Sequence, residues 1–279
     1  MQFLWPRLLV WLVSGYLIVW APWRASAAAG LTVSWTNNLL TVSGGKLPGG
    51  NLEIWYLEAF CRGKSTDRDW RQTTLPHRTT LTWASRDGKR LRLLTRVEPE
   101  VEVVHDVRAV KDEVEFLFRL TNNGRQPVDL EWFQPACIRV DRFTARNQSN
   151  YIARSFIFTG HGLTTMDQTA RREEARYRGG QVYVPAKIDL ADVNPRPISP
   201  VQPVNGLIGC FSFDDQWLLA TAWDRTHELF QGVYVCLHAD PHVGGLAPGE
   251  TKKVRGKLYL LKNDPAALLK RYERDFGKP

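Results

Sequence analysis

The chain has 279 residues, of which 37 are Lys or Arg and 29 are Asp or Glu, and its net charge is +8. Basic and acidic residues are interspersed, and no basic run carries interleaved aromatic residues, which argues against a nucleic-acid partner. The positive balance permits an acidic partner, such as a uronate- or sulfate-bearing glycan or an anionic membrane surface, but the interspersed charges fit an ordinary solvated surface better. No glycine-rich phosphate loop, Gly-x-Ser-x-Gly elbow or His-Glu-x-x-His motif occurs in the sequence. We therefore predict no cofactor, and neither nucleotide-dependent chemistry nor metalloprotease activity.

The N-terminal segment is typical of a secretory signal peptide. Arg7 precedes an uncharged apolar run over residues 8–20, whose length of about 13 residues suits a signal peptide better than a membrane span of about 20. Small residues follow at positions 25–27, so we predict a signal peptide over residues 1–27. The mature protein is then exported to the periplasm or the extracellular space, without membrane insertion. The alternative is an uncleaved anchor over residues 3–23.

Residues 28–279 are predicted to form one all-β domain. Apolar and polar residues alternate along 101–109 and again along 113–120, which is the period of a half-buried strand. Similar runs recur to about residue 262, separated by Gly- and Asn-containing turn signals. The only helix predicted follows Asp264, with Pro265 in its first turn. So many short strands joined by hairpins predict a large antiparallel β-sandwich of two sheets with a short C-terminal helix.

A long polar segment interrupts this pattern at about residues 160–205, which are rich in Arg, Pro and Gly. Long connections over a β-scaffold are usually functional or disordered. We predict a folded loop that crosses one face of the sandwich.

The four cysteines, Cys61, Cys137, Cys210 and Cys236, are widely spaced and none belongs to a Cys-x-x-Cys pair. This spacing argues against a zinc ribbon or a thioredoxin-like site. Two disulfides in an oxidising compartment and four buried thiols are both compatible with the sequence. We predict no metal ion.

A polar cluster follows the strand predicted over 233–237. If that strand continued, His238, Asp240 and His242 would point the same way, as acid–base groups or ligands do. Pro241 argues that the strand has already ended, and the alternative is then a hairpin loop with polar tips. We select His238 and Asp240 as candidate catalytic residues, with Asp240 setting the tautomer of His238.

Two other histidines stand next to carboxylates. His227 and Glu228 are adjacent in a predicted strand, so they are expected on opposite faces and not to cooperate. Glu228 is kept as a candidate substrate contact, with a surface position as the alternative. His105 shares its face with valines, which favours a core histidine.

Two further segments are candidates for sugar recognition. Arg68, Asp69 and Trp70 combine a guanidinium, a carboxylate and an indole in one loop, the groups that bind hydroxyls and the apolar face of a sugar ring. A salt-bridged loop is the alternative. Arg139 and Asp141 are expected on one face of a strand, where they either contact a ligand or form an internal ion pair.

Two stretches of the chain resemble galactose-mutarotase-like (aldose 1-epimerase-like) β-sandwiches. One runs from residue 233 through the Leu246-Ala-Pro-Gly-Glu turn to residue 260, and the other covers residues 120–135. The resemblance implies a carbohydrate-facing sandwich. The chain departs from the family at both catalytic positions, with His238 in place of the glutamate base and Gln134 in place of the histidine acid. Gln134 does not donate a proton as an imidazolium does, which argues against ordinary aldose 1-epimerisation.

The chain as a whole also resembles a group of exported bacterial proteins without an assigned mechanism. Our first functional hypothesis is an exported protein that binds or processes a carbohydrate, neutral or acidic, by a reaction that the sequence leaves open. The second is a non-catalytic envelope or protein-binding module that keeps the fold without a sugar site. The sequence predicts no oligomeric state.

Overall fold

The structure is a computed structural model that describes residues 30–277 except 146, 179, 196 and 233. The predicted signal peptide lies outside these residues. Within them, no helix combines the length and the apolar character needed to cross a membrane.

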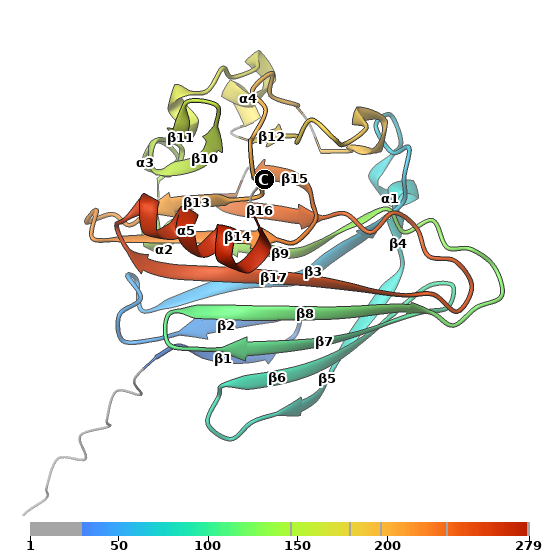
Figure 1. Ribbon diagram of the computed structural model, residues 1–279. Helices are drawn as coiled ribbons and strands as arrows, with labels where there is room; N and C mark the ends of the chain where they lie inside the picture. The colour runs from blue at the N-terminus through green and yellow to red at the C-terminus, as the bar shows by residue number, and fades with distance from the viewer. Residues whose placement is uncertain (1–29, 146, 179, 196, 233, 278–279) are drawn as a thin grey trace, which may run out of the picture.

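Two antiparallel sheets face each other, which confirms the predicted all-β sandwich (Figure 1). The eight-stranded sheet, sheet A, has the order β1 (Thr32–Thr36), β2 (Leu39–Ser43), β3 (Asn51–Cys61), β9 (Trp132–Arg139), β16 (Cys236–Pro241), β15 (Thr226–Gln231) and β12 (Gln181–Tyr183), with β4 (Thr74–Leu75) paired to β3. The nine-stranded sheet, sheet B, has the order β11 (Gly162–Thr165), β10 (Ser155–Thr159), β13 (Ile208–Phe211), β14 (Trp217–Trp223), β17 (Thr251–Lys262), β8 (Glu113–Asn122), β7 (Val101–Ala109), β6 (Arg90–Val97) and β5 (His77–Ala84).

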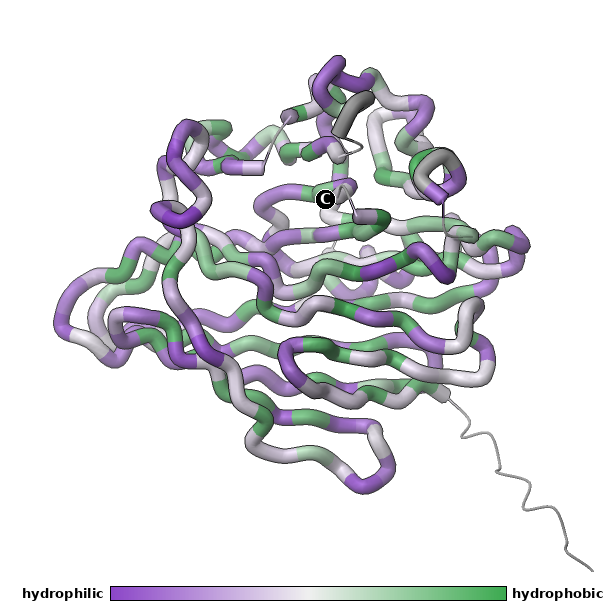
Figure 2. Tube along the Cα trace, turned by 180° about the vertical axis from the view of Figure 1, so that it is seen from behind, coloured by the Kyte–Doolittle hydropathy of each residue, from purple (hydrophilic) through white to green (hydrophobic). Residues whose placement is uncertain are grey.

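The inner faces of the two sheets form the main core. Hydrophilic and hydrophobic residues alternate along many of the strands (Figure 2), and β6 and β7 bury every second side chain. Phe118 of sheet B packs edge-on against Phe133 of sheet A, with ring centroids 5.2 Å apart. His105 lies in this core, where its Nε2 is 2.9 Å from the Thr95 hydroxyl. Burial lowers the pKa of His105 to about 3, as expected of a core histidine.

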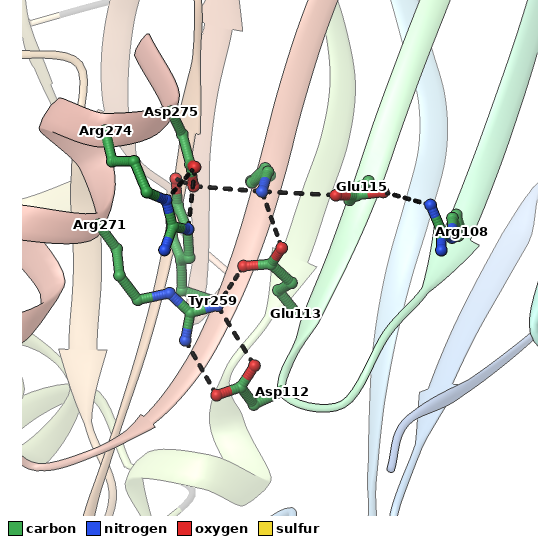
Figure 3. Close-up of polar contacts among 9 residues, drawn as sticks. Arg108, Asp112, Glu113, Glu115, Tyr259, Arg271, Arg274 and Asp275 are labelled. Atoms are coloured by element: carbon green, nitrogen blue, oxygen red, sulfur yellow. Dashed lines mark hydrogen bonds and ion pairs between the residues drawn. The ribbon is translucent and has the colours of Figure 1, made fainter. Parts of the chain in front are cut away.

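The predicted C-terminal helix is present as α5 (Pro265–Phe276). The side chain of Asp264 accepts a hydrogen bond from the Ala267 amide and caps its N-terminus. Leu268 and Tyr272 pack on the outer face of sheet B. Figure 3 shows side chains of α5 directed at carboxylates at the start of β8, so ion pairs hold the helix on the sheet as well.

The segment predicted as a long polar loop is folded and more regular than expected. With the chain just before it, it holds α2 (Asp141–Thr144), α3 (Gln148–Arg154), α4 (Glu173–Arg178), two 3₁₀ turns (Met166–Gln168 and Leu190–Asp192) and strands β10 to β12. β11 extends sheet B and β12 extends sheet A. The segment gathers at the end of the molecule opposite the β5–β6 hairpin (Figure 1).

The strand predicted over 233–237 is shifted along the chain. Tyr234 lies in a turn, Val235 has a positive φ of 54°, and β16 begins only at Cys236; residue 233 is outside the described residues. The strand then continues through Pro241, because that proline stands at the end of the ladder, where its missing N–H breaks no interior hydrogen bond.

Candidate functional site

A cavity of about 520 Å³ opens on the outer face of sheet A. Its floor is formed by side chains of β3, β9, β15 and β16, and its rim by α1 (Trp70–Thr73), residues 194–195 and the β15–β16 turn. The lining residues are Trp55, Glu58, Trp70, Gln134, Cys137, Arg139, Asn194, Pro195, Phe230, Gly232, Tyr234, Cys236 and His238. The cavity therefore brings together residues from distant parts of the chain.

The rim is fastened by hydrogen bonds between the loop before α1 and the turn that ends at residue 194. The Asn194 amide donates to the carbonyl oxygens of Ser65 and Arg68, at 2.6 and 2.9 Å. The Ser65 hydroxyl donates to the Asp192 carbonyl at 2.8 Å. These contacts fix the position of Trp70 at the mouth of the cavity.

A β-bulge in β3 supplies a carboxylate that the sequence analysis missed. Leu57 and Glu58 together oppose the single Pro135 of β9, and Leu57 has a positive φ of 61°. The bulge turns Leu57 into the core and Glu58 toward the cavity. Strict alternation would have directed Glu58 inward, so no local sequence signal identifies it. Burial raises the pKa of the Glu58 carboxyl.

His238 lies at the centre of the floor and is 3% exposed. Its Nε2 is 3.6 Å from Cys236 Sγ and 3.9 Å from Glu58 Oε2. Its Nδ1 is 3.7 Å from Asp240 Oδ1, so His238 and Asp240 point the same way, as the spacing predicted. The Gln134 amide donates to Asp240 Oδ2 at 3.1 Å, so Asp240 lies between Gln134 and His238.

The prediction that His227 and Glu228 lie on opposite faces is wrong. Both are fully buried behind the cavity, and His227 Nδ1 is 2.9 Å from Glu228 Oε2. The reason is a bulge between Thr226 and Glu228 in β15, which breaks the alternation. The His227 ring stacks on Trp132, with centroids 5.2 Å apart. Burial raises the pKa of Glu228, which supports the cavity floor without lining it.

Of the three residues in the candidate sugar-binding loop, only Trp70 lies at the cavity. Trp70 lines the cavity and is 41% exposed. Arg68 and Asp69 do not line it: Asp69 caps α1 by accepting a hydrogen bond from the Arg71 amide at 2.9 Å. Arg68 borders a separate shallow hollow with Asp189.

Arg139 and Asp141 do not share a strand face, contrary to expectation. β9 ends at Arg139, and Asp141 begins α2, so the chain turns away between them. Arg139 lines the cavity between two aromatic rings, with its guanidinium carbon 5.0 Å from the Trp55 ring centroid and 5.8 Å from that of Tyr234. Its Nε is buried without a hydrogen-bond partner.

All four cysteines are buried thiols, which is one of the two states that the sequence allowed. Ligand atoms of Cys137, Cys236 and His238 lie within 4.8 Å of one another and have the donor set of a metal site. Hydrogen bonding with Cys137 and His238 lowers the pKa of the Cys236 thiol well below its usual value. The floor thus carries two thiols and an imidazole beside the Glu58 carboxyl.

No protein-family model and no curated protein matches the chain. Among solved structures, a galactose mutarotase-like protein from Lactobacillus casei is 8% identical, with 83% of this chain and 100% of that chain covered and a TM-score of 0.43. A galactose mutarotase related enzyme from Lactobacillus acidophilus is 8% identical over 82% and 97% of the two chains, with a TM-score of 0.41. A polysaccharide lyase is 9% identical over 84% of this chain and 33% of its own, with a TM-score of 0.33. The expected likeness to galactose-mutarotase-like sandwiches is therefore found, and it is a likeness of fold.

Proposed function

We propose that the cavity on sheet A binds a carbohydrate. The observation that carries this proposal is the gathering of exposed aromatic rings around a polar floor. Trp55, Trp70 and Tyr234 are 53%, 41% and 73% exposed, and all three line the cavity. Exposed large apolar side chains that cluster mark a binding site. Flat rings beside polar groups suit the apolar C–H faces and the hydroxyls of a sugar.

Arg139 supports the same proposal because it is held ready for a ligand. Its guanidinium lies between Trp55 and Tyr234, and its Nη1 donates to the Tyr234 carbonyl at 3.3 Å. The unpartnered Nε is a donor that a sugar hydroxyl or carboxylate oxygen would satisfy. A charged donor favours a carboxylate, so we propose that uronate-containing glycans bind more tightly than neutral ones.

The experiment is a binding panel of neutral and uronate-containing oligosaccharides, followed by calorimetry and by product analysis. Product is measured because an imidazole and a carboxyl lie at the floor. We expect Trp55→Ala and Trp70→Ala each to weaken binding by about 3- to 10-fold, the loss of one stacking contact. Trp83→Ala is the matched control, because Trp83 is 52% exposed but lies on β5 of sheet B. If no oligosaccharide binds, or if all three variants bind alike, the proposal fails.

We also propose that the protein is exported, which would bring it into contact with extracellular glycans. The predicted signal peptide over residues 1–27 supports this. N-terminal sequencing of protein from the periplasmic or culture fraction is expected to begin at or near residue 28. An intact N-terminus in the membrane fraction would instead identify the segment as an anchor.

A further inference from the structure

We propose that the floor of the cavity holds one thiophilic cation of the Zn²⁺ or Cu⁺ class, bound by Cys137 Sγ, Cys236 Sγ and His238 Nε2. Two thiolates and an imidazole are ligands that both ions prefer over Mg²⁺ or Ca²⁺. The site goes beyond the proposed carbohydrate function and does not depend on it.

The geometry of the three ligands fits a tetrahedral ion. Bonds of about 2.3 Å to sulfur and about 2.0 Å to nitrogen separate those two atoms by roughly 3.5 Å across a tetrahedral centre. Cys236 Sγ and His238 Nε2 are 3.6 Å apart, and all three ligand atoms lie within 4.8 Å of one another. An ion therefore fits among them without displacement of the backbone.

The sheet holds these ligands in place. Cys236 and His238 are two residues apart on β16, so they point to the same face. Cys137 lies on the neighbouring β9, whose ladder with β16 pairs Cys236 with Arg139 and Leu237 with Ile138. The sequence predicted no metal because Cys137 lies far along the chain from Cys236 and His238, and only the β9–β16 register brings the three together.

A second, independent observation points to a ligand at His238: its other ring nitrogen and the nearby Asp240 oxygen are both unpaired. His238 Nδ1 and Asp240 Oδ1 are both buried without a hydrogen-bond partner, 3.7 Å apart. A cation on Nε2 would place the proton on Nδ1, and a small rotation of the ring would then let it donate to Asp240. Metal-bound histidines usually donate their second N–H to a carboxylate in this way. The Gln134 amide already holds the other oxygen of Asp240.

The fourth coordination position faces the cavity. Glu58 Oε2 is 3.9 Å from His238 Nε2, and the Glu58 side chain is 34% exposed. Three protein ligands with an open fourth position are typical of catalytic zinc sites, whereas a fourth protein ligand such as Glu58 would close the site as in structural ones. A disulfide between Cys137 and Cys236 is the competing state, and it excludes the ion because both sulfurs are then consumed.

The test is metal binding by the reduced full-length protein, with Zn²⁺, Cu⁺, Co²⁺ and Mg²⁺ added separately. We expect one Zn²⁺ or Cu⁺ per chain, no Mg²⁺, and a thiolate-to-cobalt charge-transfer band with Co²⁺. Cys236→Ser and Cys137→Ser should remove the band and weaken Zn²⁺ binding by more than about 100-fold. Asp240→Asn, which loses only the outer partner, should weaken it about 10- to 100-fold. Cys210→Ser is the control, because Cys210 is a buried thiol on β13 of sheet B.

Circular dichroism separates loss of the site from loss of the fold in each variant. The proposal is overturned if reduced wild-type protein gives no cobalt band, or if folded Cys236→Ser protein binds as tightly as Cys210→Ser protein. It is also overturned if peptide mapping finds a Cys137–Cys236 disulfide in protein that was produced and purified with Zn²⁺ present. The metal-binding assays are carried out without carbohydrate, so their outcome does not depend on whether the cavity binds a sugar.

Discussion

The outer faces of the two sheets each carry a cluster of charged side chains, and the clusters differ in how completely they are paired. On sheet B, Lys257 Nζ is 2.7 Å from Glu113 Oε1 and 3.2 Å from Asp275 Oδ2. The Arg271 guanidinium forms a bidentate ion pair with the Asp112 carboxylate, with Nη1–Oδ2 and Nη2–Oδ1 distances of 2.9 and 3.2 Å. We call these five residues the helix network, because they join α5 to the sheet (Figure 3).

On sheet A, the corresponding group is His227, Glu228, His238 and Asp240, which we call the cavity cluster. Its members are 0–3% exposed, yet each has one buried polar atom without a hydrogen-bond partner. Buried polar groups are normally satisfied, and an unsatisfied one is costly. In the helix network, Arg271 Nε also lacks a partner. The contrast is therefore one of degree: the helix network is mostly paired, whereas every member of the cavity cluster leaves one buried polar atom unsatisfied at a cost in stability.

The largest expected effect comes from breaking the pair at the back of the cavity. His227→Ala removes the partner of a fully buried carboxyl and leaves Glu228 unpaired. We expect the free energy of unfolding to fall by about 3–5 kcal/mol, the usual cost of breaking a buried pair. Denaturant unfolding measures it, with His161→Ala at an exposed turn as the matched control. Equal losses in the two variants would contradict the importance of the pair.

Replacing both His227 and Glu228 with apolar side chains should leave the free energy of unfolding unchanged or raise it, in contrast to His227→Ala. The double variant His227→Phe, Glu228→Met removes two unsatisfied polar atoms and keeps a ring against Trp132. We expect unchanged or higher stability, by up to about 4 kcal/mol, as for other buried ion pairs replaced by apolar groups. The same unfolding measurement decides this. A double variant less stable than His227→Ala would show that the cavity cluster is structural, which would erase the contrast with the helix network.

The sequence predicted those features that depend on local periodicity. Alternation of apolar residues along β7 and β8 predicted the sandwich and the core position of His105, because burial of one sheet face imposes a period of two. The same period placed His238 and Asp240 on one side of β16.

The rest of the site depends on exceptions to that period and on register between distant strands. The bulges at Glu58 and His227 reverse the face that simple alternation assigns, and neither has a glycine or other local signal. Cys137 meets Cys236 only through the β9–β16 ladder, which one sequence does not specify. Asp141 is separated from the site because β9 ends at Arg139 and α2 begins at Asp141, and the sequence pattern did not mark this strand end.

A smaller effect is expected in the helix network. Lys257→Met removes an ammonium that contacts Glu113, Glu115 and Asp275, and the carboxylates then repel one another. We expect a loss of about 1–2 kcal/mol in the free energy of unfolding, because water reaches this partly exposed surface and replaces part of the lost interaction. Lys253→Met, on the same strand, is the control. A loss as large as that of His227→Ala would mean that both clusters are equally structural.

The smallest effect is the pH dependence that Asp275 of the helix network contributes. Burial raises the pKa of Asp275, but hydrogen bonds from Arg274, Lys257 and Tyr259 outweigh it and lower the pKa below the usual value of 3.8. A lowered pKa in the folded state stabilises the protein above the unfolded pKa, and this stabilisation is lost as the pH falls through the folded pKa. Wild-type protein should therefore exceed Asp275→Asn in unfolding free energy by about 0.5–1 kcal/mol near neutral pH, and the difference should shrink only below the usual carboxyl pKa. In a Lys257→Met background the difference should be smaller at every pH, because one of the hydrogen bonds that lowers the pKa is gone. A difference that stays constant down to strongly acidic pH would show that Asp275 acts through packing rather than charge, and that the helix network is less electrostatic than its contacts indicate.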